Sequence, residues 1–189
     1  MWDIENHKKF FPNSFVEQGD DGRVYGTFII GNYYKRTVPY HGAYPPSYLN
    51  RIRTLFPDNK KILHLFSGML VKELGETTFD INPTLGPDVY GNAEELSRYF
   101  EPDSYDLIIS DPPYDQKNAA VYGTKVPRTH LVMSELSKVV SGRGYVVWLC
   151  TRIPMYRKDQ WDLAGLIMLY CGTNRLVRAI VILQRKESV

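Results

Sequence analysis

The chain has 189 residues, a length that suits one domain with a single core rather than two. Hydrophobic residues make up 43% and charged residues 23%, so disordered, collagen-like and coiled-coil classes are excluded. The net charge of +2 neither requires nor forbids a nucleic-acid partner, because a local basic patch would be enough.

The sequence carries no signal for export or membrane insertion. It has no run of 18 apolar residues, and its first segment, MWDIENHKKFFPN, is charged where a secretory signal needs an apolar centre. We therefore expect a cytoplasmic protein with no membrane partner. The two cysteines, Cys150 and Cys171, lack the spacing of a zinc site or a disulfide framework. Buried free thiols and no bound metal are expected.

The first part of the chain, residues 1–45, is expected to be an N-terminal extension of short strands and loops, with a strand at 24–30. Apolar residues recur with helical spacing after Ser47, which predicts a helix of about ten residues. Four short apolar runs follow, which predict strands at 61–66, 77–81, 87–91 and 105–110. A short helix from Ala93 to Phe100, opened by Asn92, is expected between the last two.

In the second half, apolar positions with helical spacing predict a helix over residues 128–140. Strands are expected at 145–150, 165–171 and 177–183, with a short amphipathic segment near 155–163. Strands that alternate with helices predict an α/β fold with a mainly parallel sheet, an antiparallel end, and helices on both faces. We expect one domain over residues 1–189, with its core at 46–189.

The sharpest local feature is the sequence SDPPY, which directly follows the expected strand at 105–110. Pro112 and Pro113 fix two φ angles and remove two backbone donors, so the turn is stiff and its carbonyl groups are free to accept hydrogen bonds. Asp111 and the Pro112 carbonyl could hold an exocyclic amine while Tyr114 stacks on the attached ring. The alternative interpretation is a rigid exit from the strand, with Tyr114 as packing.

With this motif, the chain resembles the amino-methyltransferases that use S-adenosylmethionine, in which a D/N/S-P-P-Y/F/W motif follows the fourth strand. The resemblance covers about residues 39–184 and implies a Rossmann-like methyltransferase fold with a mainly parallel seven-stranded sheet. It assigns the catalytic positions to Asp111, Pro112, Pro113 and Tyr114, and it requires no metal. It leaves no room for a separate target-recognition domain.

The resemblance also implies where S-adenosylmethionine would bind. ILHLFSG is similar to the family's first motif, Asp80 matches the acidic residue that takes the ribose hydroxyl groups, and GNA resembles the segment beside the cofactor's adenine. PYHGAYPP resembles the segment that reaches the methionine end. Leu70 stands where the family has a second glycine, so a differently shaped pocket is expected. The implied cofactor residues are Tyr40, His41, Gly42, Leu65, Phe66, Ser67, Gly68, Asp80, Ile81, Asn92, Ala93 and Asp111.

A nucleic-acid base buried in a duplex is out of reach, so the substrate would be flipped out or single-stranded. The segment from Asp115 to Arg128 is expected to cover the pocket. Basic residues that follow the strand at 145–150, among them Arg157 and Lys158, are expected to add a rim at the same edge. TNRLVR at 173–178 supplies Arg175 and Arg178, either as a second contact or as part of a hairpin. The expected substrate residues are Lys117, Asn118, Tyr122, Arg128 and Arg152.

Methyl transfer to adenine N6 or cytosine N4 in DNA is the favoured function, with short loops, a partner subunit or a homodimer to supply specificity. One alternative is methylation of RNA, because DPPY/F also occurs in small ribosomal-RNA guanine methyltransferases. Protein-glutamine methyltransferases resemble NPPY instead and fit less well. A different class of protein, a catalytically silent fold that scaffolds an active partner, also fits, because Leu70 replaces the family's second glycine in FSGML (66–70).

Overall fold

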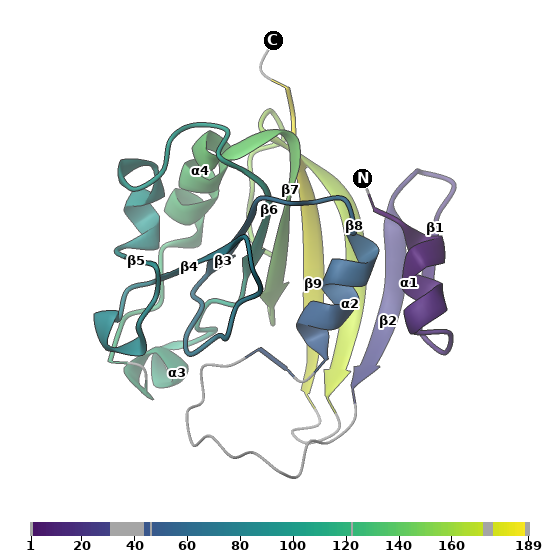
Figure 1. Ribbon diagram of the computed structural model, residues 1–189, viewed down its shortest axis with the longest axis horizontal. Helices are drawn as coiled ribbons and strands as arrows, with labels where there is room; N and C mark the ends of the chain where they lie inside the picture. The colour runs from purple at the N-terminus through teal and green to yellow at the C-terminus, as the bar shows by residue number, and fades with distance from the viewer. Residues whose placement is uncertain (1, 31–43, 46, 122, 172–175, 188–189) are drawn as a thin grey trace.

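The structure is a computed structural model, and it describes residues 2–30, 44–45, 47–121, 123–171 and 176–187 (Figure 1). These residues form one nine-stranded sheet with the order β1-β2-β8-β9-β7-β6-β3-β4-β5. The strands are β1 (Phe15–Gln18), β2 (Val24–Ile30), β3 (Ile62–Leu65), β4 (Glu76–Asp80), β5 (Val89–Tyr90), β6 (Tyr105–Ser110), β7 (Val140–Cys150), β8 (Trp161–Cys171) and β9 (Leu176–Arg185). The helices are α1 (Ile4–Phe10), α2 (Tyr48–Leu55), α3 (Gln116–Val121) and α4 (Thr129–Val139), with 3₁₀ helices η1 (Pro83–Leu85) and η2 (Ala93–Arg98).

The centre of the sheet is parallel, as the sequence predicts. β3 pairs in parallel with both β4 and β6, β4 with β5, and β6 with β7. β9 is the antiparallel strand of this core and lies between β7 and β8. The expected α/β fold with a mainly parallel sheet is therefore confirmed. The expected seven-stranded sheet is extended to nine strands by β2, which is the strand expected at 24–30, and by β1.

The N-terminal extension differs from the expectation, because α1 forms where loops and strands were predicted. The Asp3 side chain caps this helix by accepting the Asn6 N–H at 2.7 Å. The residue that α1 buries is His7, a polar side chain, so the apolar spacing that signals a helix is missing from the sequence. β2 joins the same sheet beside β8, and β1 pairs antiparallel with β2.

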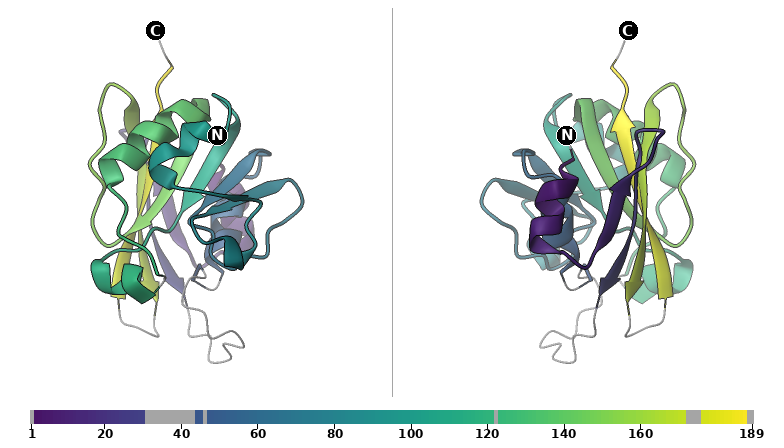
Figure 2. Two further views of the ribbon diagram at one scale, coloured as in Figure 1. Left: turned by 90° about the vertical axis from the view of Figure 1, so that its left-hand side faces the viewer. Right: turned by 90° about the vertical axis from the view of Figure 1, so that its right-hand side faces the viewer.

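Two apolar clusters cover the two faces of the sheet. α1 and α2 lie on one face, where Phe28, Ile52 and Ile109 belong to the same buried cluster. α4 and η2 cover the other face around Leu96, Leu136 and Trp148 (Figure 2). Within the described ranges, no helix is long and apolar enough to cross a membrane.

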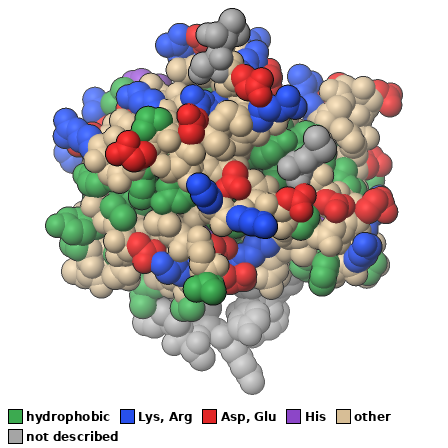
Figure 3. Space-filling model, turned by 45° about the horizontal axis from the view of Figure 1, so that its top comes forward, with side chains coloured by type: hydrophobic (Ala, Val, Ile, Leu, Met, Phe, Trp, Pro, Cys, Tyr) green, Lys and Arg blue, Asp and Glu red, His purple; other side chains and the backbone are tan. Residues whose placement is uncertain are grey.

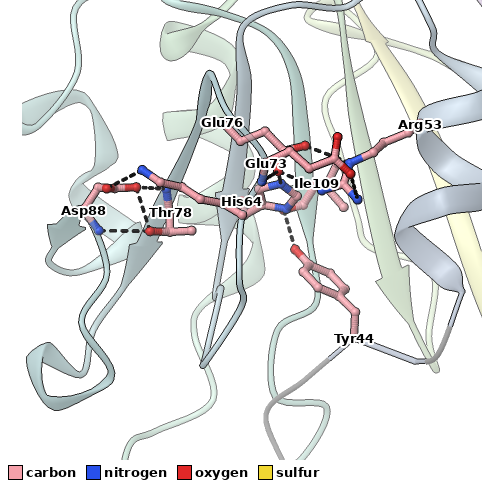
Figure 4. Close-up of polar contacts among 9 residues, drawn as sticks. Tyr44, Arg53, His64, Glu73, Glu76, Thr78, Asp88 and Ile109 are labelled. Carbon is pink, nitrogen blue, oxygen red and sulfur yellow. Dashed lines mark hydrogen bonds and ion pairs between the residues drawn. The ribbon is translucent and has the colours of Figure 1, made fainter. Parts of the chain in front are cut away.

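A group of charged side chains centred on the buried Glu76 ties α2 to the strands (Figure 4). Arg53 on α2 donates from Nε and Nη2 to the two carboxylate oxygens of Glu76, at 2.8 and 2.7 Å. Its Nη1 lies 2.9 Å from the Glu73 carboxylate, and the Glu73 N–H donates to Glu76 at 2.9 Å. The buried His64 ring on β3 places Nε2 3.1 Å from Glu76. These contacts fix the loop between β3 and β4 against α2.

The Glu76 carboxyl is held ionised by its neighbours. Burial alone would raise its pKa, but His64, Arg53 and the Glu73 N–H outweigh burial and hold the pKa well below the ordinary range. A carboxyl with a lowered folded-state pKa stabilises the fold above its unfolded pKa, and this contribution is lost as the pH falls through the folded value.

We predict that Glu76→Ala lowers the free energy of unfolding at pH 7 by about 3 kcal/mol, because it leaves the Arg53 charge buried without its main partner. Urea unfolding would measure the loss, which should shrink as the pH is lowered below about 4. Glu73→Ala is the matched control, because its side chain is 64% exposed and its ion pair should contribute less than about 1 kcal/mol. Equal losses in both variants would contradict the prediction.

Candidate active site at the carboxyl edge of the sheet

Three neighbouring parallel strands end side by side at the lower edge of the sheet in Figure 1. Leu65, the last residue of β3, is in register with Phe79 on β4 and with Ser110 on β6. The residues that follow these strands are therefore neighbours in space. In an open α/β sheet, ligands bind outside such carboxyl ends.

The turn after β3 is tightly held. Phe66 and Gly68 both have positive φ, 61° and 56°, and Phe66 is strained there because it carries a side chain. The Ser67 N–H donates to the Phe79 carbonyl at 3.1 Å, and the Gly68 N–H donates to the Asp80 carboxylate at 2.9 Å. The turn is therefore clamped to the end of β4, with Ser67 buried inside it.

Leu70 follows the same turn and is half-buried. Its N–H donates to the Ser67 carbonyl at 3.2 Å, and its side chain packs against the core cluster on the α2 side of the sheet. The position that departs from the family pattern therefore contributes a side chain to the core.

The other residues expected to bind a cofactor follow β4 and β5. The second carboxylate oxygen of Asp80 accepts the Asn82 N–H at 3.0 Å, and the Gly91 N–H donates to the Asp80 carbonyl at 2.9 Å. Asn92 caps η2 by accepting the Glu94 N–H at 3.0 Å. Ala93 is buried and Ile81 is exposed. The expected Tyr40, His41 and Gly42 lie outside the described residues.

The motif after β6 forms a small polar cluster with a residue from β9. The Tyr114 hydroxyl donates to Asp111 Oδ1, and Arg178 Nη1 donates to that hydroxyl at 3.2 Å. The Arg178 guanidinium carbon lies 5.5 Å from the centre of the Tyr114 ring. Because β9 runs antiparallel to β7, its first residues reach the carboxyl edge. Pro112 is buried beside this cluster, and Pro113 is half-buried.

The cluster shifts the pKa values of its members. Burial raises the pKa of Asp111 to about 6, against the Tyr114 hydrogen bond and the Arg178 charge, which lower it. Burial, followed by the nearby Asp111 charge, raises the pKa of Tyr114, so its hydroxyl stays protonated and remains a donor. Burial also raises the pKa of the Cys150 thiol to about 12, which makes it unreactive. Cys150 and Cys171 are both free and buried, as predicted.

Two tyrosines and a serine that the sequence analysis did not assign to the site lie beneath it. The Tyr44 hydroxyl donates to the Ile109 carbonyl at 3.1 Å, and its ring stacks on Tyr48 with centroids 5.5 Å apart. Among the described residues, the buried Tyr48 hydroxyl, Ser110 Oγ and Ser67 Oγ have no hydrogen-bond partner. Buried polar atoms normally have partners. Tyr48 belongs to the apolar cluster on the α2 face together with Ile109, whereas Ser110, the next residue on β6, points to the opposite face, so these two hydroxyl groups lie on different faces of the sheet.

The residues expected to contact substrate are spread along the same edge. Lys117 is exposed on α3, and Arg152 is exposed just after β7. Arg128 precedes α4 and is bound to Glu94, which accepts its N–H at 2.7 Å and its Nε at 2.9 Å. The side chain of Asn118 and all of Tyr122 lie outside the described residues.

The expected basic rim after β7 is partly wrong, because residues 151–160 carry the chain to the opposite edge of the sheet. β8 is antiparallel to β9, so it starts where β9 ends, and Trp161 pairs with Arg185. Arg157, whose carbonyl accepts the Trp161 N–H at 3.0 Å, therefore lies at that opposite edge and forms an ion pair with Asp159. Figure 3, which brings this edge forward, shows acidic and basic side chains intermingled on this side.

Comparison with known proteins identifies the fold. No family model and no curated protein matches the chain. Among solved structures, TrmN from Thermus thermophilus superposes with a TM-score of 0.58 at 13% identity, over 77% of this chain and 50% of that protein. A putative methyltransferase, YhhF from Escherichia coli, covers 85% of this chain and 99% of its own at 14% identity, with a TM-score of 0.48.

The chain therefore has the Rossmann-like methyltransferase fold that the sequence predicts. It spans about half the length of TrmN. At this level of identity, the likeness extends to the fold alone.

We predict that Tyr114→Phe raises the pKa of Asp111 above its value of about 6. The lost hydroxyl donates to the carboxylate and so favours its ionised form. NMR titration of ¹³C-labelled aspartate carboxyl groups would measure the shift. Tyr90→Phe is the matched control, because its ring is 65% exposed on β5 and should leave the Asp111 titration unchanged. An unshifted pKa in Tyr114→Phe would show that the hydrogen bond does not form in solution.

Proposed function

We propose that the chain transfers a methyl group from S-adenosylmethionine to the exocyclic amine of a nucleic-acid base, with adenine N6 or cytosine N4 in DNA as its first substrate. The observation that carries this proposal is the position of Asp111. Its carboxylate is a hydrogen-bond acceptor on a turn stiffened by two prolines, at the end of the strand beside the Phe66–Gly68 turn.

The carboxyl edge offers groups that fit the cofactor. The clamped turn lies at the carboxyl edge, and Ser67 and Ser110 supply buried hydroxyl groups that lack partners in the described structure. Asp80 retains acceptor capacity beyond its two backbone N–H bonds, because an ionised carboxylate has about four lone-pair sites. The residues that would hold the cofactor are Leu65, Phe66, Ser67, Gly68, Asp80, Ile81, Asn92 and Ala93, with Tyr40, His41 and Gly42 added on the resemblance. When bound, S-adenosylmethionine supplies a methyl group on a positively charged sulfur.

The residues of the DPPY motif would orient the amine. An amine attached to an aromatic ring is a poor nucleophile because its lone pair is delocalised, so positioning must supply most of the help. In this proposal Asp111 and the Pro112 carbonyl accept hydrogen bonds from the amine and direct its lone pair, while Tyr114 stacks on the base. The amine proton can leave after transfer, so no strong base is required.

The nucleic acid would approach along the edge that carries Lys117, Arg128 and Arg152. Cationic side chains are common partners of phosphate groups, and the exposed Lys117 and Arg152 are suited to this role. Arg128 is paired with Glu94, so it contributes less net charge. A partner subunit or a second copy of the chain would supply sequence recognition.

The first test is S-adenosylmethionine binding by calorimetry, followed by transfer of a labelled methyl group to mixed DNA and RNA. We predict that Asp111→Ala lowers the transfer rate by about 100-fold or more, because an acceptor for the amine is lost, and leaves cofactor affinity within a few-fold. Tyr90→Phe serves as the matched control and should keep full activity.

Each outcome assigns a function. Binding with label on DNA supports the proposal, and label on RNA alone moves the substrate to the alternative class. Absence of binding favours the catalytically silent scaffold. Full transfer by Asp111→Ala would remove its role in orienting the amine.

We also predict an acid limb in the rate of transfer. Asp111 accepts hydrogen bonds with both oxygens when it is ionised, and its pKa in the free protein is about 6. The value of kcat/KM should therefore fall about tenfold for each pH unit below 6, with a midpoint that moves upward in Tyr114→Phe. A pH–rate profile with an acid limb near pH 4 would contradict this assignment.

A further inference from the structure

Arg178 is the residue at this edge whose contacts the family resemblance does not explain. It lies on β9, opposite Leu169 of β8, and its side chain reaches the cluster formed by Asp111 and Tyr114. Its Nε atom is buried and has no hydrogen-bond partner in the described part of the chain. A guanidinium has five N–H donors and no acceptor, so Arg178 can only donate to whatever completes the site.

Asp111 and Arg178 meet at a single atom, the Tyr114 hydroxyl oxygen. This hydroxyl donates to the Asp111 carboxylate and accepts from Arg178 Nη1 at 3.2 Å. The two residues therefore present an acceptor and a donor side by side, on two different strand ends. A group that replaces the hydroxyl must also donate on one side and accept on the other, or leave a buried polar atom unpaired.

The edges of the bases differ in this pattern. Adenine presents its N6 amine as a donor next to N1, an acceptor, and cytosine presents its N4 amine next to N3, also an acceptor. On its Watson–Crick edge, guanine presents its N2 amine next to the N1–H, a second donor. Enzymes that act on an extruded base read these Watson–Crick edges by hydrogen bonds.

We infer that Arg178 is a specificity-determining residue, which donates to the ring nitrogen beside the target amine while Asp111 accepts from that amine. The pair selects adenine or cytosine and rejects guanine, whose N1–H would face the Arg178 donors. Tyr114 moves its hydroxyl out of this place when the base enters, and its ring becomes free to stack. This inference rests on the proposed methyl transfer and narrows its substrate class.

The test uses strands in which one base carries an exocyclic amine. Each DNA strand would consist of thymine, and each RNA strand of uracil, apart from one adenine, cytosine or guanine. Thymine and uracil have no exocyclic amine, so the inserted base is the one possible acceptor of this kind. For the unaltered protein, we expect kcat/KM for guanine to be at least about 100-fold below that for the better of adenine and cytosine. Arg178→Met should lower kcat/KM for the preferred base by about 10- to 100-fold and leave kcat/KM for guanine unchanged. The ratio between the two values should therefore become smaller.

A substrate that lacks the ring-nitrogen acceptor shows whether Arg178 contacts the base or only supports Tyr114. 1-Deazaadenine lacks the N1 acceptor. For the unaltered protein, replacing adenine by 1-deazaadenine should therefore lower kcat/KM by about the same factor as Arg178→Met lowers it on adenine. For Arg178→Met, kcat/KM should be the same on 1-deazaadenine as on adenine, because the Arg178 donor and the N1 acceptor act as one pair. Arg178→Lys keeps the charge with a different donor geometry, so its kcat/KM on adenine should lie between those of the unaltered protein and Arg178→Met. Arg98→Met, on an arginine that is 72% exposed at the end of η2, is the control and should keep full selectivity.

The outcomes keep this inference apart from the proposed function. Equal losses by Arg178→Met on adenine and 1-deazaadenine would overturn it, because Arg178 would then act by holding Tyr114 alone. Transfer to guanine by the unaltered protein, at a rate comparable to adenine, would overturn it while methyl transfer itself stands. Absence of transfer to every base would overturn both. Thermal melting followed by circular dichroism would show whether each variant is folded.

Discussion

The candidate site depends on the parallel pairing of β4, β3 and β6, because this pairing makes three strands end at one edge. The register places Leu65 beside Phe79 and Ser110, so the Phe66–Gly68 turn, Asp80 and Asp111 all follow from one alignment. A slip of one residue would turn every side chain of a strand to the other face and separate these groups. The buried Arg53–Glu76 contacts oppose such a slip, since they fix the start of β4 to α2.

Much of the fold could be predicted because local patterns and the final structure agree. The expected strands at 24–30 and 105–110 coincide with β2 and β6, and the expected helix at 128–140 contains α4. The amino end of the chain was harder, because α1 buries a histidine and spans less than two full turns of apolar spacing. The strand expected at 145–150 begins earlier, at Val140, since β7 accommodates the turn residues GRG as an irregularity in its pairing with β6.

The site could be predicted where a motif follows its own strand, and not where a contact joins distant segments. Asp80 and Asp111 stand directly after strands that apolar runs reveal. Arg178 contacts Tyr114 because β9 is antiparallel and inserted between β7 and β8, which no local pattern states. The same topology explains why Arg157 is far from the site. The connection from β7 to β8 runs from the carboxyl edge back to the opposite edge, where β8 begins. The sequence names Arg178 as a possible second contact, but only the position of β9 in the sheet shows that it reaches Tyr114.

The position of β9 also sets the order in which the sheet can be completed. Among the described strands, β9 comes last in the chain, yet it supplies the pairing partner of both β7 and β8, and β8 in turn carries β2. Until β9 is made, the nascent chain holds β7 with an open edge, and β2 and β8 are separated from the rest of the sheet. Pairings between segments so distant in sequence are slow to form, because loop closure costs entropy before contacts repay it. The strand that carries Arg178 is thus also the one that joins two partial sheets, so the contact between Arg178 and Tyr114 requires that the two partial sheets are joined.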